Sequence, residues 1–492
     1  MAFKDMRDWI NKLEEAGQLK RITTEVDLDK EVGTIARKVF TTGGPALLFE
    51  NIKGYQTTRC TKIFTGGLAA RVRMALMLGL PPETKFNDIV QELRKRLKNP
   101  IPPVEVPTGP VKENIVRGDE VNLFEFPVPK WHPRDGGRYF STWCAIITRD
   151  PDTGQLNAGL YRGQILDKNK IGVLLVGAQH WGVHFAKYRA IGKPMPVAIA
   201  CGWDPVMAPV AACPVQNIDE FPVMGGLRGE AVELTRCETS DLMVPASAEI
   251  VVEGFISPDP PTYEVEGPFA EYTGYYGDTR KRPVIKVECI THRHDPIYRG
   301  SLEGQKPGTV GDPPRPNETS RIISAMVSAL TWKILDEQGV PGILDLTAGT
   351  TTFVRIRKMY RGHAKQVAAA LWGSSTSLYL YKNVVVVDED IDIRDLRSLE
   401  WAFSYRVNAA EDDIVVFPGM PGSPLDPAIR YHDRNELEFG AGKWSRVLID
   451  ATKNWDYPRV AEWDYDRYPP LASDVDPESE RLVEQRWAAY GL

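Results

Sequence analysis

The feature that most constrains the fold is a long run of short, β-branched segments between Asn114 and Cys289, which glycine and proline interrupt at frequent intervals. Examples are STWCAIITRD, IGVLLVGA, PVAIACG, GEAVELTRCE, AEIVVEGFIS and PVIKVECITH. Short strands at this spacing favour a compact, mostly antiparallel sheet that closes toward a barrel. We therefore predict a β-domain of barrel type in the middle of the chain.

The segment before this region has the pattern of an α/β unit. Apolar residues recur at helical spacing from Phe3 to Leu13, and Gly17 follows as a helix C-cap. We expect a strand from Leu19, a helix over residues 30–40, a buried strand over residues 46–51 and a charged helix over residues 86–98. The proline-rich stretch NPIPPVEVPTGP comes next, and its fixed φ values suit an extended linker and not a packed element. This places the first domain boundary near residue 105.

The helical period returns near Asn317, with four apolar residues on one face: Ile323, Met326, Leu330 and Ile334. Beyond it, GILDLTAG, LYLYKNVVVVDED and DDIVVFPG have the composition of parallel strands, and helices are predicted between them over residues 364–372 and 393–403. A charged helix over residues 474–490 ends the chain, with Trp487 as its largest apolar side chain. We expect this helix to dock on a neighbouring subunit.

Bulk properties exclude several classes of protein. A chain of 492 residues exceeds what one core usually supports, so two or three domains are expected. The net charge of −6 argues against nucleic acid or an anionic membrane as main partner. No apolar run approaches the roughly 20 residues of a membrane span, and the charged amphipathic N-terminus is unlike a signal peptide, which predicts a cytoplasmic protein. The six cysteines lack any CxxC spacing, which favours free buried thiols over disulfides or a zinc site.

The segment Tyr263 to Gly277, YEVEGPFAEYTGYYG, carries three carboxylates among proline, glycine and aromatic residues. These are Glu264, Glu266 and Glu271. Desolvation among such neighbours raises the pKa of a carboxyl group toward the range in which it delivers a proton at neutral pH. The segment is thus typical of a proton-transfer site. The alternative is a solvated loop whose acidic side chains face water.

Three further segments carry polar residues of chemical interest: NAGLYRGQ (157–164), GAQHWGVH (177–184) and IDEFPVMGGLRG (218–229). Taken singly, Arg162 fits a surface ion pair, His180 a hydrogen-bonded core histidine and Glu220 a solvated acid. Taken together, Asn157, His180 and Glu220 offer an amide oxygen, an imidazole and a carboxylate. This mixed set suits Mn²⁺ or Mg²⁺, with phosphate and water oxygens completing an octahedron.

The chain resembles the UbiD family of decarboxylases, which use prenylated flavin mononucleotide (prenylated FMN). The resemblance covers nearly the whole length and is carried by RDWINKLEEAGQLKRI, GGPALLFENIKG, WHPRDGGRY, NAGLYR, QHWGVHF, EFPVMGGLRGE, DLMVPASAEIVVEG, EGPFAEYTGYY and GKWSRVLIDAT. It implies an α+β fold with four parts. These are an N-terminal α/β domain (1–105), a central split β-barrel that binds the flavin (106–315), a C-terminal α/β domain (316–470) and an oligomerisation helix (471–492).

The resemblance also implies roles for individual residues. Asn157, His180 and Glu220 match the divalent metal ligands that hold the flavin phosphate, and Arg162, Glu266 and Glu271 match the catalytic set. Further cofactor contacts are implied at Leu160, Tyr161, Arg162 and Gln179, and backbone carbonyls near Ala211 and Cys213 match a K⁺ or Na⁺ site. The substrate pocket would be walled by Thr319, Ile323 and Leu425. One departure is Ala270, where the family pattern has glycine, and its methyl group is expected to alter loop packing slightly.

The implied activity is the reversible, non-oxidative decarboxylation of an aromatic, heteroaromatic or acrylic acid through a covalent adduct with prenylated FMN. No amino-acid side chain can take up the electron pair left by CO₂, so a cofactor must carry that step. Arg162 would hold Glu266, while Glu271 would donate the proton that replaces CO₂. We expect the arginine to lower the pKa of one carboxylate and not the other. A flavin prenyltransferase would supply the cofactor, and the chain would form a homodimer or a larger oligomer such as a hexamer.

Two other functions are open to a chain of this kind. A split β-barrel also hosts unmodified FMN in oxidoreductases, but no GxGxxG follows a strand here and redox chemistry does not need the Arg162, Glu266 and Glu271 set. A non-catalytic subunit of a carboxylase assembly is the second alternative. The complete set of predicted catalytic and metal residues counts against it. The sequence does not distinguish among carboxylic acid substrates or between the two reaction directions.

Overall fold

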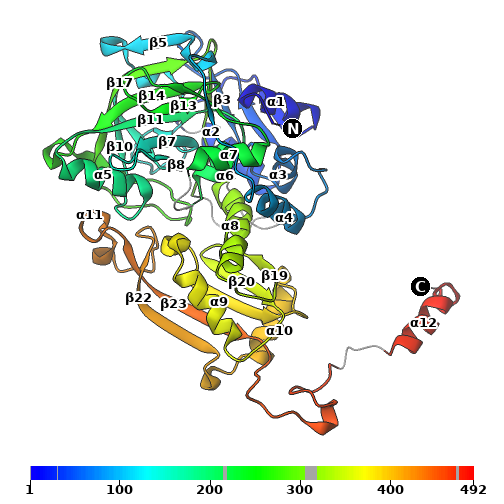
Figure 1. The fold of residues 1–492 in the computed structure, drawn as a ribbon. Helices are drawn as coiled ribbons and strands as arrows, with labels where there is room; N and C mark the ends of the chain where they lie inside the picture. Colours follow the sequence, from blue (N-terminus) through cyan, green and yellow to red (C-terminus); the bar gives the residue numbers. More distant parts are fainter. Residues whose placement is uncertain (1, 30, 214–218, 305–317, 472–475, 492) are drawn as a thin grey trace.

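A computed structural model describes residues 2–29, 31–213, 219–304, 318–471 and 476–491. The predicted segment starts at Lys30, Ile218, Asn317 and Asp474 lie outside these residues. Figure 1 shows the N-terminal and central elements together at one end of the molecule, and the C-terminal sheet at the other. Helix α8 (Glu318–Glu337) connects the two ends, and helix α12 (Pro477–Arg486) stands apart from both.

The N-terminal elements form the predicted α/β unit. A four-stranded sheet in the order β1-β2-β3-β18 is accompanied by four helices: β1 (Leu19–Ile22), β2 (Ala46–Phe49), β3 (Lys62–Thr65), β18 (Ile297–Arg299), α1 (Met6–Glu15), α2 (Glu31–Thr41), α3 (Arg71–Met77) and α4 (Phe86–Arg96). Helix α1 buries the predicted apolar stripe, including Trp9 and Leu13. The sheet is completed by β18, which comes from the segment after the central strands and pairs parallel to β3.

The central sheet confirms the predicted barrel-like domain. Eight strands follow the order β6-β9-β10-β17-β14-β11-β7-β8, and β5 pairs with β17. The strand pairs of this sheet within the described residues are all antiparallel. The strands are β5 (Asn114–Arg117), β6 (Tyr139–Ser141), β7 (Cys144–Arg149), β8 (Leu156–Leu160), β9 (Gly163–Asp167), β10 (Lys170–Val173), β11 (Met195–Cys201), β14 (Ile250–Ile256) and β17 (Val284–His292). Their β-branched side chains, such as Ile146, Ile199 and Val252, are buried together in one core cluster.

Shorter elements surround the barrel: α5 (His180–Ala190), α6 (Met207–Ala211), α7 (Glu220–Arg228), β4 (Val104–Glu105), β12 (Glu233–Arg236), β13 (Met243–Pro245), β15 (Glu264–Glu266) and β16 (Arg280–Arg282). The proline-rich segment is extended, as predicted, but it is not a free linker. Strand β4 pairs parallel to β12, and Val104 and Val106 donate backbone hydrogen bonds to Val232 and Leu234. The prolines leave alternate N–H groups available, which is enough for pairing at the edge of a sheet.

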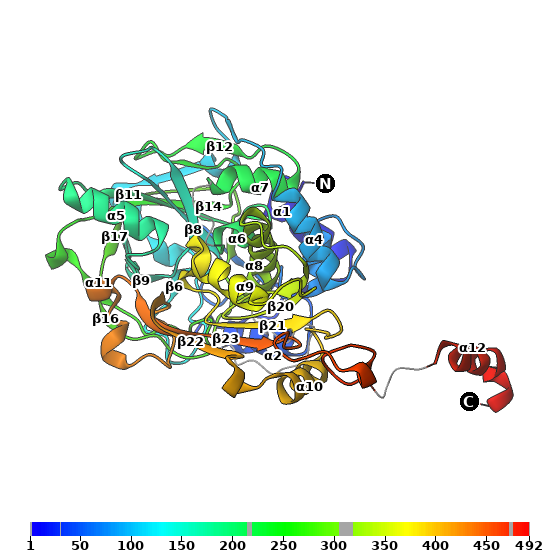
Figure 2. The ribbon, with the colours of Figure 1, turned by 60° about the horizontal axis from the view of Figure 1, so that its bottom comes forward.

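Helix α8 is buried more completely than its sequence pattern predicts. The predicted face includes Met326 and Leu330, but Arg321, Ser324, Ser328 and other residues around the helix are buried as well. Helix α8 contacts α4, α6, α9 and β19, so it is covered from several sides (Figure 2). One apolar cluster therefore runs from the N-terminal helices through α8 into the C-terminal sheet.

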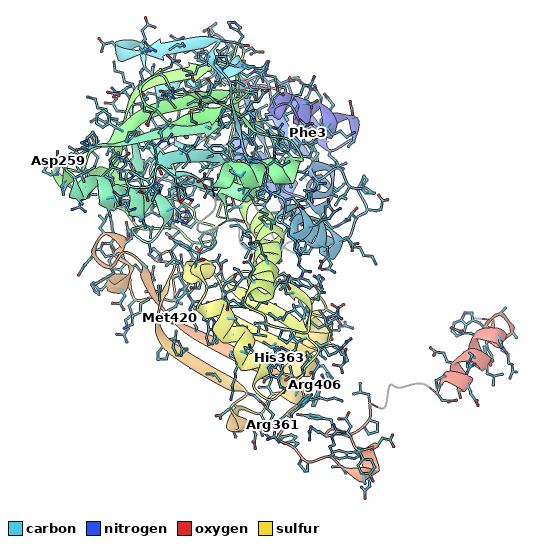
Figure 3. All side chains as sticks on the ribbon, in the orientation of Figure 1. Phe3, Asp259, Arg361, His363, Arg406 and Met420 are labelled. Carbon is cyan, nitrogen blue, oxygen red and sulfur yellow. The ribbon has the colours of Figure 1, made fainter. Side chains whose placement is uncertain are left out.

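The C-terminal sheet has the order β19-β20-β21-β23-β22: β19 (Ile343–Thr347), β20 (Thr351–Ile356), β21 (Asn383–Asp388), β22 (Ile414–Gly422) and β23 (Gly442–Ala451). Helices α9 (His363–Trp372), α10 (Leu396–Arg406) and α11 (Glu436–Phe439) accompany it. The expectation that these predicted strands are all parallel is wrong, because β19 and β22 are antiparallel to their neighbours. The turn of residues 348–350 between β19 and β20 is too short for a parallel crossover. Arg406, labelled in Figure 3, anchors α10 through ion pairs with Asp388 and Asp390.

All residues of α12 and of the following turn Trp487–Tyr490 are exposed, including Leu482, Val483 and Trp487. The six cysteines are free and buried, as predicted. Within the described ranges, no helix combines the length and the apolar character needed to cross a bilayer.

Candidate active site

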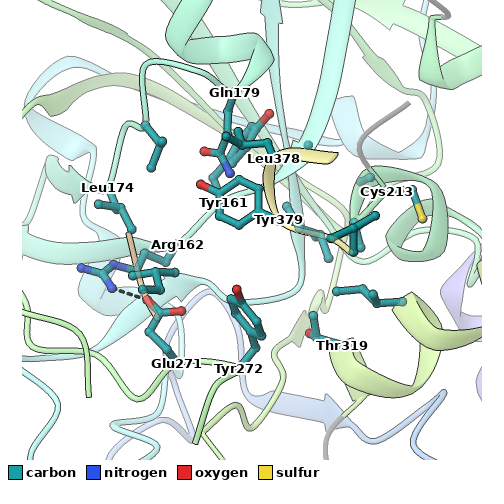
Figure 4. A pocket seen from close by; sticks show the side chains of 18 of the residues that line it. Tyr161, Arg162, Leu174, Gln179, Cys213, Glu271, Tyr272, Thr319, Leu378 and Tyr379 are labelled. Atoms are coloured by element: carbon teal, nitrogen blue, oxygen red, sulfur yellow. Dashed lines mark hydrogen bonds and ion pairs between the residues drawn. The ribbon is translucent and has the colours of Figure 1, made fainter. Parts of the chain in front are cut away.

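A cavity of about 280 Å³ lies between the barrel and the C-terminal sheet. Its size is near the lower end of the range of small-molecule sites, about 300–1,000 Å³. Of the fourteen site residues predicted from the sequence, all but Glu266 line this cavity: Asn157, Leu160, Tyr161, Arg162, Gln179, His180, Ala211, Cys213, Glu220, Glu271, Thr319, Ile323 and Leu425. In the view of Figure 4, Arg162 and Glu271 lie on one side of the cavity, and Thr319 and Cys213 on the other.

Arg162 binds both predicted catalytic carboxylates. Arg162 lies just after β8, which ends at Leu160. Its guanidinium reaches the end of β15, where Glu266 lies, and the loop that follows, where Glu271 lies. Nη2 donates to Glu266 Oε2 at 2.8 Å, and Nη1 donates to Glu271 Oε1. All three side chains are buried, so these charge-assisted bonds are shielded from water. The expectation that the arginine acts on the pKa of one carboxylate and not the other does not hold, because Arg162 binds both and also opposes the rise in the pKa of Glu271.

A second arginine distinguishes the two carboxylates. Arg282, in β16, donates to Glu266 Oε2 at 2.7 Å, and Tyr139 donates its hydroxyl to Glu266 Oε1 at 2.9 Å. Three donors thus stabilise the negative charge of Glu266, which lies behind Arg162 and not on the cavity wall. Glu271 has one arginine and faces the cavity.

Glu271 has the environment of a proton donor. Burial raises the pKa of its carboxyl group, and the charge and hydrogen bond of Arg162 oppose this shift without cancelling it. A carboxyl group that keeps its proton closer to neutral pH is a better general acid under physiological conditions. The two carboxylates therefore differ in their surroundings: Glu271 is buried on the cavity wall with one arginine, whereas Glu266 also binds Arg282.

Asn157, His180 and Glu220 meet at another part of the cavity. His180 Nδ1 lies 3.2 Å from Asn157 Oδ1 and 3.7 Å from Glu220 Oε1. His180 is the first residue of α5 and Glu220 the first residue of α7, so two helix N-termini converge on Asn157. Burial raises the pKa of Glu220, against the opposing effect of His180.

This cluster fits a divalent metal bound to a phosphate. Two oxygen donors and one imidazole nitrogen are ligands that Mn²⁺ and Mg²⁺ accept, and helix N-termini attract phosphate oxygens. The buried amide Nδ2 of Asn157 has no hydrogen-bond partner among the described residues. A group of three His, Cys, Asp or Glu residues with metal-site geometry is not found in the described ranges, and the cluster here depends on an amide as its third donor.

The remaining predicted cofactor contacts surround this cluster. The ring of Tyr161 stacks on Trp181 with centroids 4.2 Å apart, and Trp181 donates to Gln179 Oε1 at 3.3 Å. Ala211 and Cys213 lie at and just after the end of α6, on the cavity wall. The contacts of Trp181 hold the planar side chains of Tyr161 and Gln179 in fixed positions on the cavity wall.

Ala270, the departure from the family pattern, is buried beside Gly304. A Cβ added at Gly304 would collide with the Ala270 methyl group, so the two residues pack in direct contact. The backbone N–H of Ala270 donates to Asp135 Oδ1 at 3.1 Å. The methyl group thus packs against Gly304, and its effect on the loop relative to a glycine stays a prediction.

Sequence reasoning missed several residues of the site: Tyr139, Arg282, Glu303 and Tyr379. For Arg282 a signal was present, because the acidic EVE of β15 and the basic RKR of β16 are complementary and form one antiparallel pair. Glu303 and Tyr379 come from segments far from the motifs, and only the tertiary structure brings them to the cavity.

Comparison with known proteins places the chain in a family. The N-terminal, Rift-related and C-terminal domain profiles of 3-octaprenyl-4-hydroxybenzoate carboxy-lyase match residues 10–93, 103–306 and 320–451. The chain belongs to the UbiD family. It is an enzyme of the carboxy-lyase class, as the sequence predicted.

Relatives and solved structures align over the whole chain. An uncharacterized protein of Archaeoglobus fulgidus is 35% identical, with 99% of this chain and 98% of that protein covered. The vanillic acid decarboxylase of Sedimentibacter hydroxybenzoicus in closed form is 31% identical, with a TM-score of 0.87 and 99% of each chain covered.

A second group of solved structures contains flavin. The UbiD-class enzyme HmfF of Pelotomaculum thermopropionicum, in complex with FMN, is 29% identical with a TM-score of 0.78, covering 97% of this chain and 98% of that one. An evolved dimeric form of HmfF in complex with prenylated FMN is 28% identical with a TM-score of 0.76, covering 97% of this chain and 100% of that one. These proteins share the fold and the flavin-binding character of the family.

Proposed function

We propose that this protein is a prenylated-FMN-dependent enzyme that reversibly decarboxylates an aromatic or heteroaromatic carboxylic acid. The proposal rests on a single cavity whose wall carries two separate groups of polar residues. Asn157, His180 and Glu220 converge at one part of its wall, and Arg162 and Glu271 are joined at another. A phosphate-bearing cofactor and an acid substrate are the two ligands that these groups fit.

The residues of the chain supply binding, orientation and a proton. Prenylated FMN, when bound, supplies the electron sink that no side chain provides. Arg162 offers a positive charge that attracts the carboxylate of the substrate into the cavity. Glu266, fixed by Arg162, Arg282 and Tyr139, keeps that guanidinium in place. Glu271 delivers the proton that replaces CO₂, and in the carboxylation direction it takes that proton up.

Asn157, His180 and Glu220 would hold Mn²⁺ or Mg²⁺ against the cofactor phosphate. Carbonyl groups near Ala211 and Cys213 would bind K⁺ or Na⁺ at the same end of the cavity. Thr319, Ile323 and Leu425 line the cavity and offer small to medium side chains to the substrate. An aromatic acid is favoured over an acrylic one because the decarboxylases with similar structures include one named for vanillic acid.

Cofactor dependence tests this function. Protein produced without prenylated FMN should release no CO₂ from a panel of aromatic and heteroaromatic acids. Protein produced together with a flavin prenyltransferase and supplied with Mn²⁺ should release it, because the electron sink is then present. Full turnover with plain FMN, or without any flavin, would refute the proposal.

The matched variants for this test are His180→Ala and His432→Ala. His180 lies beside Asn157 and Glu220, whereas His432 is an exposed histidine on the turn Tyr431–Arg434, outside the cavity. His180→Ala should lower flavin occupancy, measured by absorbance, while His432→Ala keeps it. Equal flavin content in the two variants would show that His180 does not support cofactor binding.

We also propose that the chain assembles into a homodimer or larger oligomer through its C-terminal region. The exposed apolar side chains of α12 and its following turn have no core of their own, and covering them removes them from water.

Deleting residues 474–492 should therefore weaken assembly while leaving the barrel folded. Sedimentation velocity at micromolar concentration would measure the first effect, and flavin content the second. An unchanged oligomer after the deletion would show that α12 is not needed for assembly.

A further inference from the structure

Glu303 is a buried carboxyl group on the cavity wall that the proposed chemistry does not use. It follows β18 and is 7% exposed, and it lines the same cavity as Glu271 and Thr319. It reaches the site from the N-terminal sheet, whereas Glu271 follows β15, so the two carboxyl groups arrive from different parts of the fold.

Only one of its two carboxyl oxygens is satisfied among the described residues. Ser301 Oγ and Thr319 Oγ1 both donate to Oε1, at 2.9 Å and 2.6 Å. Oε2 is buried and has no partner within the described part of the chain. A buried carboxylate oxygen without a partner carries a large desolvation cost, and native proteins normally satisfy such atoms.

Four other polar atoms of wall residues are also without a partner among the described residues, but Asn157 Nδ2 and Arg162 Nε are donors that would need an acceptor. Ser141 Oγ and Tyr379 Oη are neutral hydroxyl groups, which lose less on burial than a charged group does. Glu303 is therefore the wall residue with the strongest need for a hydrogen-bond donor. Burial raises the pKa of its carboxyl group to about 7, so a substantial fraction is ionised at neutral pH.

The charge of Glu303 also restricts how an acid can lie in the cavity. A substrate carboxylate is attracted by Arg162 and repelled by Glu303. Glu303 therefore meets a different part of the substrate, away from the reacting carboxylate. Its packing is fixed, because the adjacent Gly304 lies against the Ala270 methyl group and Thr319 holds Oε1 from α8.

We propose that Glu303 is a specificity-determining residue that accepts a hydrogen bond from a donor on the substrate ring, so that the preferred acids carry a ring hydroxyl or a ring N–H. This inference rests on the proposed function, because it assigns the substrate class of the same cavity.

The test uses matched acids with holoenzyme that contains the cofactor and Mn²⁺. 4-Hydroxybenzoic acid is compared with 4-fluorobenzoic acid for the hydroxyl arm, and pyrrole-2-carboxylic acid with furan-2-carboxylic acid for the N–H arm. Calorimetry gives the dissociation constants, and CO₂ release gives the rates. We expect the donor-bearing acid of at least one pair to bind about 10- to 100-fold more tightly, as expected for a hydrogen bond to a charged group.

Two variants make the assignment specific. Glu303→Leu should reduce the preference in the responsive pair to within about twofold. Glu303→Gln keeps a carbonyl acceptor for Ser301 and Thr319 but places an amide donor where Oε2 lies, so it should reverse the preference of pyrrole over furan. A hydroxyl group can also accept a hydrogen bond, so the hydroxyl pair should retain part of its preference in this variant.

Equal binding of both acids in both pairs by the wild-type enzyme would overturn the inference. An unchanged preference in both variants would also overturn it, since a residue other than Glu303 would then recognise the donor on the substrate ring. If the binding preference depends on Glu303 but no acid releases CO₂, the subsite stands and the decarboxylase function fails.

Discussion

Replacing Glu271 by glutamine is expected to lower turnover by about 10²- to 10⁴-fold while flavin content stays unchanged. The amide keeps the shape of the side chain and a carbonyl oxygen for Arg162 Nη1, but it has no acidic proton to deliver. The measurement is single-turnover CO₂ release together with the flavin absorbance of the purified variant.

Glu264→Gln is the matched control for this prediction. Glu264 lies two residues before Glu266 in β15, pairs with Lys170 and does not line the cavity. Its substitution should leave turnover within about twofold of the wild-type rate. A Glu271→Gln enzyme as active as the Glu264→Gln enzyme would remove Glu271 from the mechanism.

The pH profile gives an independent check on Glu271. Burial raises the pKa of its carboxyl group, so the protonated form persists to higher pH than in an exposed glutamate. If the protonated form is the active one, turnover should be maintained at low pH and decline as pH rises through that raised pKa. This alkaline decline should be absent from the residual activity of the Glu271→Gln variant.

Arg282→Met is expected to destabilise the folded protein by about 3–5 kcal/mol, the usual cost of removing one partner from a buried ion pair. Arg282 is 1% exposed and binds three carboxylates, Glu266, Asp278 and Glu436, at 2.7 Å each. Glu436 belongs to α11 of the C-terminal region, so this arginine ties that region to the catalytic set. Turnover should fall as well, because Glu266 loses one of the two arginines that position it.

The control is Arg280→Met, in the same strand. Arg280 pairs with Asp278 and lies over the ring of Tyr431, but its side chain is partly exposed and does not reach Glu266. Thermal unfolding of both variants measures the difference. If the two apparent Tm values fall equally, the buried ion pairs of Arg282 contribute no more to stability than the partly exposed ion pair of Arg280.

Local pattern was sufficient to predict most elements. The stripe from Phe3 to Leu13 predicted α1, and the β-branched runs between Asn114 and Cys289 predicted the barrel, because burial of one face imposes a period on the sequence. The direction of the strands and the number of buried helix faces were harder to predict. The antiparallel edges β19 and β22 and the burial of α8 on several sides depend on which partners lie beside them, and the period of a single segment does not record that.

The site also combines features that the sequence predicts with features that depend on tertiary contacts. The family could be predicted from the sequence, and so could thirteen of the residues that line the cavity, because motifs such as NAGLYR and EGPFAEYTGYY keep their side chains close along the chain. Only the tertiary structure decided how these residues are grouped and charged. It placed Arg162 between Glu266 and Glu271, brought Arg282 to Glu266 and not to Glu271, and added Glu303 from a distant sheet. Protonation and substrate recognition depend on burial and on neighbours across space, and these arise only when separate segments pack together.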